Sequence, residues 1–194
     1  MKAKISHYLL GLMAYVAIMP IADAHTLGAY DAGLVAGLAH PFMGLDHLLA
    51  MIAVGIWAIQ LGGRAVWLVP LTFVSVMSVA AALGSFGFSL PLLEPAIASS
   101  VLVLGLLIAG SVRLSASSGA VLVGLFALFH GYAHGLELPQ AATPILYGFG
   151  FVLATALLHV IGIGFAVSSR KYKIVQRIAG YALVAASGLL LAAA

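Results

Sequence analysis

The chain of 194 residues contains no cysteine and few charges, because Asp, Glu, Lys and Arg together make up only 7% of it. A soluble domain carries about 25% charged residues. Without cysteine the chain has neither a disulfide framework nor a thiolate metal site. The phosphate-binding pattern GxxxxGK[ST] is absent, so the sequence predicts no ATP and no nucleic acid as partners. The remainder is 64% hydrophobic and predicts an integral membrane protein whose partner is the lipid bilayer.

Residues 1–24 have the pattern of a secretory signal peptide. Lys2 and Lys4 form a basic start, an apolar run follows, and Ala-Asp-Ala ending at Ala24 supplies small residues at a cleavage site. The apolar run of about a dozen residues is short against the ~20 that span a bilayer. We therefore expect cleavage after Ala24 and a mature chain that begins at His25, the alternative being an uncleaved first helix.

Six further apolar segments follow, separated by breaks too short for a soluble domain. They are residues 32–60, 65–84, 95–112, 118–135, 143–168 and 174–193. The sequence therefore predicts an all-α, polytopic membrane protein. Its residues 25–194 would form one domain of six transmembrane helices after a cleaved signal peptide. Short breaks also predict that consecutive helices are antiparallel neighbours.

The positive charges of the mature chain predict its orientation. They fall only at the first, third and fifth breaks, at Arg64, Arg113, Arg170, Lys171, Lys173 and Arg177. Cytoplasmic loops carry the excess of Lys and Arg. We therefore expect a multi-pass protein of the bacterial inner membrane with its mature N-terminus on the periplasmic side. Asp31, Glu94 and Glu137 would then lie outside, where negative charge favours cations.

The segment HPFMGLDHLLAM, residues 40–51, concentrates polar groups inside an apolar run. On one continuous helix, spacings of three, four and seven residues would share a face, and this stripe would hold His40, Met43, Gly44, His47 and Met51. Ionisable groups such as Asp46 at membrane depth usually face a bundle interior or an aqueous path. His40 and His47 would lie ~10 Å apart along a straight helix. One ion would reach both only across a helix break, which Pro41 could provide; otherwise the sites lie in series.

A second polar cluster, FHGYAHGLE, covers residues 129–137. Its two histidines are one turn apart on one face, and its glutamate lies at the helix end. We expect His47 and His130 to lie at similar depth and close enough to share one ion or water. The candidate metal ligands are His25, His40, Asp46, His47, His130, His134, Glu137 and His159. His159 stands alone in its segment, where a hydrogen bond to a neighbouring helix is an equal alternative. Imidazole with carboxylate suits Ni, Co, Cu and Zn among divalent ions.

Both clusters resemble those of a known family. HPFMGLDHLLAM is similar to the HPxxGxDHxxxM signature of the HupE/UreJ family of nickel/cobalt permeases, and FHGYAHGLE resembles that family's second motif. The similarity extends over nearly the whole mature chain. It implies uptake of Ni²⁺, sometimes Co²⁺, for metalloenzymes such as hydrogenase or urease. It also implies roles for the matching residues, which are His40, Asp46, His47, His130, His134 and Glu137.

Three functions are compatible with the sequence. The first is a metal-ion permease with no enzymatic activity and no required cofactor, which transports Ni²⁺, then Co²⁺, then Zn²⁺ in order of expectation, as a monomer or a homo-oligomer. The second is an intramembrane zinc-dependent hydrolase. Against it, the pattern HGYAH lacks the glutamate that HExxH places beside its first histidine. The third is a membrane scaffold with structural histidines, which would bind no metal.

Overall fold

The structure, a computed structural model, describes residues 29–139 and 142–193. The signal-peptide interpretation of residues 1–24 and the candidate ligand His25 lie outside these ranges and stay predictions. The secondary structure within them is entirely helical. The helices are α2 (Ala29–Met43), α3 (Leu45–Leu61), α4 (Ala65–Gly84), α5 (Leu93–Gly110), α6 (Ala116–Leu136), α7 (Pro144–Ser168) and α8 (Lys173–Ala193).

The predicted number of membrane crossings depends on how the first apolar segment is counted. Helices α4 to α8 are each long and apolar enough to cross a membrane, and α2 with α3 makes a sixth crossing if the two form one broken span. The last five segments begin and end within two residues of the predicted bounds. The all-α, multi-pass prediction is therefore confirmed for the described ranges.

The prediction of one continuous helix through residues 40–51 is wrong. Helices α2 and α3 meet at an angle of 82°, and the break falls at Gly44, which has extended backbone angles. Pro41 lies inside α2; it withholds one backbone donor, yet the helix continues two residues beyond it. The predicted stripe is consequently split, because Met43 is 60% exposed whereas Met51 is fully buried.

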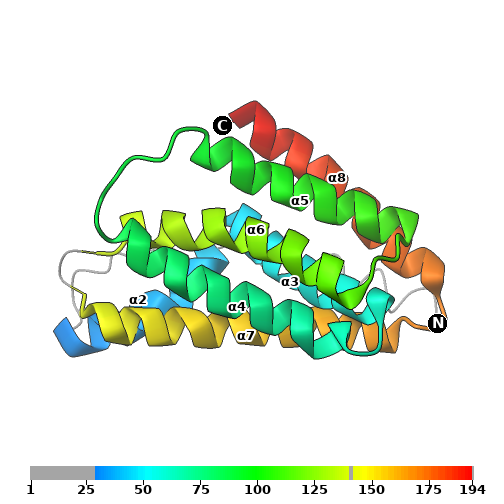
Figure 1. Cartoon of the computed structure of the whole chain (residues 1–194), viewed down its shortest axis with the longest axis horizontal. Coiled ribbons are helices and arrows are strands. Elements are labelled where there is room, and N and C mark those ends of the chain that lie inside the picture. The colour runs from blue at the N-terminus through cyan, green and yellow to red at the C-terminus, as the bar shows by residue number, and fades with distance from the viewer. Residues whose placement is uncertain (1–28, 140–141, 194) are drawn as a thin grey trace, which may run out of the picture.

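The loops alternate between two ends of the bundle (Figure 1). The α3–α4, α5–α6 and α7–α8 loops lie at one end, with all six Lys and Arg residues of the described ranges in these loops or within the first two turns of α8. We call this the basic end. The α4–α5 and α6–α7 loops lie at the other, which we call the acidic end because Glu94 and Glu137 are there.

Close backbone approach decides which helices pack together. A β-carbon at Gly131 of α6 would overlap the carbonyl oxygen of Met77 in α4, and one at Gly37 of α2 would overlap that of Tyr147 in α7. Small residues let membrane helices approach to this distance. Glycines join α3 to α7 and α5 to α8 in the same way, at Gly55, Gly162, Gly105 and Gly180.

These glycine contacts correct the prediction that consecutive helices are antiparallel neighbours. The most extensive pairs are α4 with α6, α2 with α7, α5 with α8, and α3 with α7, of which Figure 1 shows α5 and α8 together along one edge. Helices α4 and α6 both run from the basic to the acidic end, so they are parallel. Loop length alone does not determine the partner, because a glycine-lined face fits only a backbone that it can approach.

Helix α3 lies at the centre of the bundle. It contacts each of the other described helices, and nearly all of residues 50–59 are buried. A helix that is apolar all round is expected in such a position. Because α3 begins at the break after Gly44, its first turn opens toward the acidic end with His47 and Asp46 on it.

Candidate metal centre

A cavity of about 360 Å³ lies where the broken first segment meets the acidic end of the bundle. Its walls come from α2, α3, the start of α5 and the end of α6. It is lined by His40, Met43, Gly44, Asp46, His47, Glu94 and Glu137. Among the described residues that line it, three are carboxylates and two are imidazoles, and none is Lys or Arg. Such a cavity attracts cations.

Asp46 fixes the orientation of His47. Its Oδ1 accepts a hydrogen bond of 2.7 Å from the His47 backbone N–H and lies 2.7 Å from His47 Nδ1. A carboxylate on Nδ1 makes that nitrogen the protonated one, which leaves the lone pair on Nε2. Nε2 of His47 is buried and has no partner in the described protein. The pair therefore presents one free imidazole nitrogen to the centre of the bundle.

His40 and Glu137 form the outer wall of the cavity. His40 Nε2 lies 2.9 Å from Glu137 Oε2, and the Glu137 side chain is 49% exposed. The hydrogen bond from His40 holds the pKa of Glu137 below its ordinary range. The glutamate is therefore ionised wherever imidazoles are neutral enough to bind a metal.

His134 joins the two sides of the site. It is 1% exposed, and its ring centroid lies 4.6 Å from that of His40 and 4.2 Å from that of His47. Neither of its nitrogens has a hydrogen-bond partner in the described protein. Ligand atoms of His40, His134 and Glu137 all lie within 4.8 Å of one another, close enough to hold one metal ion. The 82° break is what brings His40 and His47 to the same third imidazole.

His130 lies one turn deeper on α6 and is completely buried. Its ring is 4.8 Å from that of His47, so the predicted approach of these two side chains is confirmed. Its Nε2 lies 2.8 Å from Ser100 Oγ in α5. Because the Ser100 hydroxyl donates its proton to the Ile97 carbonyl at 2.7 Å, Nε2–H of His130 is the donor and Nδ1 carries the lone pair.

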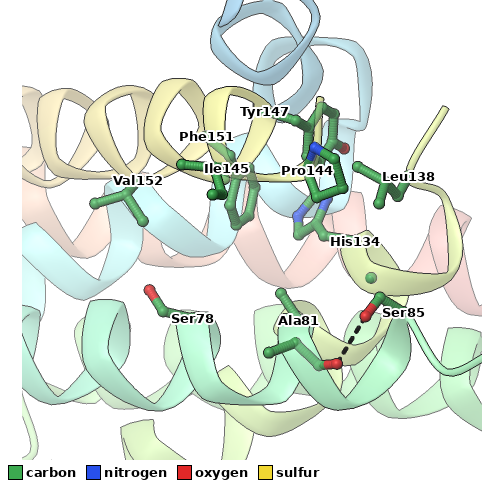
Figure 2. Close-up of a pocket in the computed structure, with 13 residues that line it drawn as sticks. Ser78, Ala81, Ser85, His134, Leu138, Pro144, Ile145, Tyr147, Phe151 and Val152 are labelled. Atoms are coloured by element: carbon green, nitrogen blue, oxygen red, sulfur yellow. Dashed lines mark hydrogen bonds between the residues drawn. The ribbon is translucent and has the colours of Figure 1, made fainter. Parts of the chain in front are cut away.

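A second cavity, of about 310 Å³, adjoins the cluster between α4, α6 and α7. Figure 2 shows the His134 ring on its wall beside Tyr147 and Pro144, with Ser78 and Ala81 of α4 and the following Ser85 opposite. The ring of Phe151 covers His134 at a centroid distance of 3.9 Å. His134 therefore borders this cavity on one side while it touches His40 and His47 on the other.

The structure thus gathers His40, Asp46, His47, His130, His134 and Glu137 at one site. His159, two turns beyond Phe151 on α7, lies apart from them. Sequence reasoning missed Ser100 and the aromatic cover of Tyr147 and Phe151, because small hydroxyls and aromatics are common in membrane helices and carry no motif. Glu94 was placed on the outer side but not recognised as lining the site.

Comparisons with known proteins bear on the whole chain. The family model described as "HupE / UreJ protein" matches residues 12–191. Protein HupE of Rhizobium leguminosarum bv. viciae is 48% identical over 181 residues, which cover 92% of this chain and 94% of that protein. No solved structure matches.

Proposed function

The chain belongs to the HupE/UreJ family, and on that premise we propose that it is a permease that carries a divalent transition-metal ion across the bacterial inner membrane. One observation supports this most directly. Four imidazoles and two carboxylates from three helices converge beside a cavity at the acidic end, and several of their buried nitrogens have no hydrogen-bond partner in the part of the chain that the structure describes. Unpartnered buried polar groups are costly, and a passing metal ion would satisfy them.

The ligand set favours a divalent transition-metal ion as the cargo, and the family resemblance, not the ligand set, puts Ni²⁺ or Co²⁺ ahead of Zn²⁺. Imidazole nitrogens and carboxylate oxygens suit these borderline ions, whereas Mg²⁺ and Ca²⁺ prefer oxygen alone. The ion would serve a metalloenzyme such as a hydrogenase or a urease. No resident cofactor is needed for this role.

The geometry supports a stepwise path. His40, His134 and Glu137 would capture the ion, because Glu137 is half exposed and ionised. His134 touches both His40 and His47, so the ion would pass from the outer ligands to His47, held by Asp46, and then to His130. Weak sites in succession allow both entry and release.

The proposed orientation of the protein in the membrane would let the membrane potential drive uptake of the ion. The distribution of Lys and Arg predicts that the basic end faces the cytoplasm, and the cavity would then lie on the periplasmic side. The membrane potential would then favour entry of a divalent cation by ~4.6 kcal/mol per 100 mV, twice the value for one charge. If the signal peptide is cleaved after Ala24, the α-amine and imidazole of His25 would chelate the ion ahead of His40.

The zinc-hydrolase alternative gains no support from the family or from the similar protein. The carboxylates of the site are paired with imidazoles, Asp46 with His47 and Glu137 with His40, which positions them to hold ligands. A general base would instead have to face a metal-bound water.

Nickel uptake by proteoliposomes that contain the purified full chain tests the proposal. Wild-type protein should accumulate ⁶³Ni²⁺, and His130→Gln should reduce the initial rate at least tenfold. Glu137→Gln should mainly raise the metal concentration for half-maximal uptake. Wild-type vesicles that take up no more nickel than empty vesicles, and no cobalt or zinc either, would refute the permease.

A further inference from the structure

His159 is a second kind of buried imidazole, separate from the cluster at the acidic end. It is 2% exposed, and neither of its ring nitrogens has a hydrogen-bond partner in the described protein. The alternative expected from sequence, a hydrogen bond to a neighbouring helix, is therefore not present. Buried polar side chains are nearly always partnered, so one with two free nitrogens requires a specific reason.

His159 lies closer to the basic end of the bundle than the cluster does. Phe151 of α7 touches His134, and His159 follows it eight residues later toward the basic end. At ~1.5 Å per residue this is ~12 Å of travel along the helix axis. His159 thus lies inward of the last cluster ligand in the orientation proposed above.

A single aromatic ring links His159 to the cluster. The Phe73 ring of α4 lies 5.7 Å from the ring of His130 and 5.2 Å from the ring of His159, centroid to centroid. Phe73 is completely buried. Among the described residues it is the one ring recorded in contact with both imidazoles. Phe73 therefore contacts the deepest imidazole of the cluster and His159 at once.

Two further side chains with donor atoms lie on α7 and α4, one turn nearer the acidic end than His159 and Phe73. Thr155 and His159 are four residues apart on α7, as are Phe73 and Met77 on α4, so each pair shares a helix face. The Thr155 hydroxyl lies 3.8 Å from the Met77 sulfur, and both side chains are completely buried. Sulfur is a weak acceptor, so this hydroxyl can turn toward a better partner.

We propose that His159, with the hydroxyl of Thr155, forms a second, inner station for the transported divalent metal ion, and that Phe73 is the gate between it and His130. This proposal rests on the permease function and extends it. The outer cluster captures the ion from dilute solution, and the inner station receives it only when the phenyl ring moves. The ring also excludes water between the two stations, so the membrane is not left open when the outer site is empty.

The test combines Co²⁺ binding with uptake, using the purified full chain. Co²⁺ absorbance and equilibrium dialysis give the number of bound ions, and proteoliposomes give the initial rate. In His159→Gln one bound Co²⁺ should be lost, the outer ion should remain, and uptake should fall at least tenfold. Phe73→Trp should keep outer binding and slow uptake by a similar factor. Leu158→Ala, which truncates an equally buried neighbour on α7, should change neither the number of ions nor the rate by more than twofold.

The outcomes separate this proposal from the one on which it rests. If wild-type protein transports metal and His130→Gln does not, while His159→Gln binds as many ions and transports as fast as wild type, the inner station is refuted and the permease stands. If wild-type protein transports no metal, the permease itself fails. Should His159→Gln not fold, as judged by its melting temperature and gel filtration, Thr155→Val and Phe73→Trp provide the same comparison of ion number with rate.

Discussion

At the scale of single residues, the hydrogen-bond partners of two imidazoles determine which of their nitrogens are free. Asp46 holds Nδ1 of His47, and the Ser100 hydroxyl accepts from Nε2 of His130. Each leaves one specific nitrogen for an ion. Partners of this kind tune metal affinity by about 10- to 100-fold.

Asp46→Asn should abolish uptake while the protein stays folded. The amide removes the negative charge that offsets a divalent ion at membrane depth, and it no longer fixes the protonated nitrogen of His47. We expect at least a hundredfold lower initial rate of nickel uptake in proteoliposomes. An unchanged melting temperature would show that folding is intact, and uptake at the wild-type rate would remove Asp46 from the mechanism.

Ser100→Ala should shift the tautomer of His130 and weaken metal binding about tenfold. ¹⁵N NMR of histidine-labelled protein reports the tautomer directly, and Co²⁺ titration reports the affinity. Ser187→Ala is a matched control, because Ser187 is equally buried but bonds only the Val184 carbonyl within α8. Identical spectra for the two variants would show that Ser100 does not position His130.

At the scale of helices, the break at Gly44 is the feature on which the site depends. A β-carbon there would lie 2.9 Å from Asp46 Oδ1 and 3.0 Å from His47 Nδ1. These contacts are tighter than normal packing allows, so Gly44→Ala should push the two side chains apart.

We expect Gly44→Ala to lower metal affinity by about 10- to 100-fold, as loss of a ligand-orienting partner does. The measurement is Co²⁺ titration of the purified chain. Gly148→Ala on α7 is the control, since a β-carbon there meets nothing within 4 Å. Equal affinities in the two variants would contradict the idea that the bare α-carbon of Gly44 keeps the Asp46–His47 pair intact.

The sequence predicted most of this arrangement but not its geometry. Hydropathy located the helices, because a bilayer demands long apolar runs, and the motifs located six of the residues that converge. The sequence offered Pro41 only as a possible break within one apolar segment, whereas the break lies at Gly44, because the proline weakens α2 without ending it. The pairs of helices that pack together were also not predicted. They depend on which glycine of one helix faces the backbone of another in three dimensions.

At the scale of the whole molecule, the orientation can be measured simply because the chain has no cysteine. Ser89→Cys lies in the α4–α5 loop at the acidic end, and Tyr172→Cys in the α7–α8 loop at the basic end. In intact spheroplasts a membrane-impermeant maleimide should label Ser89→Cys at least tenfold faster than Tyr172→Cys. The reverse order would invert the proposed direction of transport.

The glycine contacts divide the bundle into groups of helices, which we call bodies. Within each body the helix backbones touch directly, with no side chain between them that could move. Helices α4 and α6 make one such body, and α2, α3 and α7 make another. His134 and Phe73 belong to the first, whereas His40, His47 and His159 belong to the second. The contacts of His134 with His40 and His47 and that of Phe73 with His159 therefore cross the boundary between the two bodies, whereas the contact of Phe73 with His130 lies within the first body. A metal ion in the cluster would therefore hold the two bodies together, because His134 lies on one of them and His40 and His47 lie on the other.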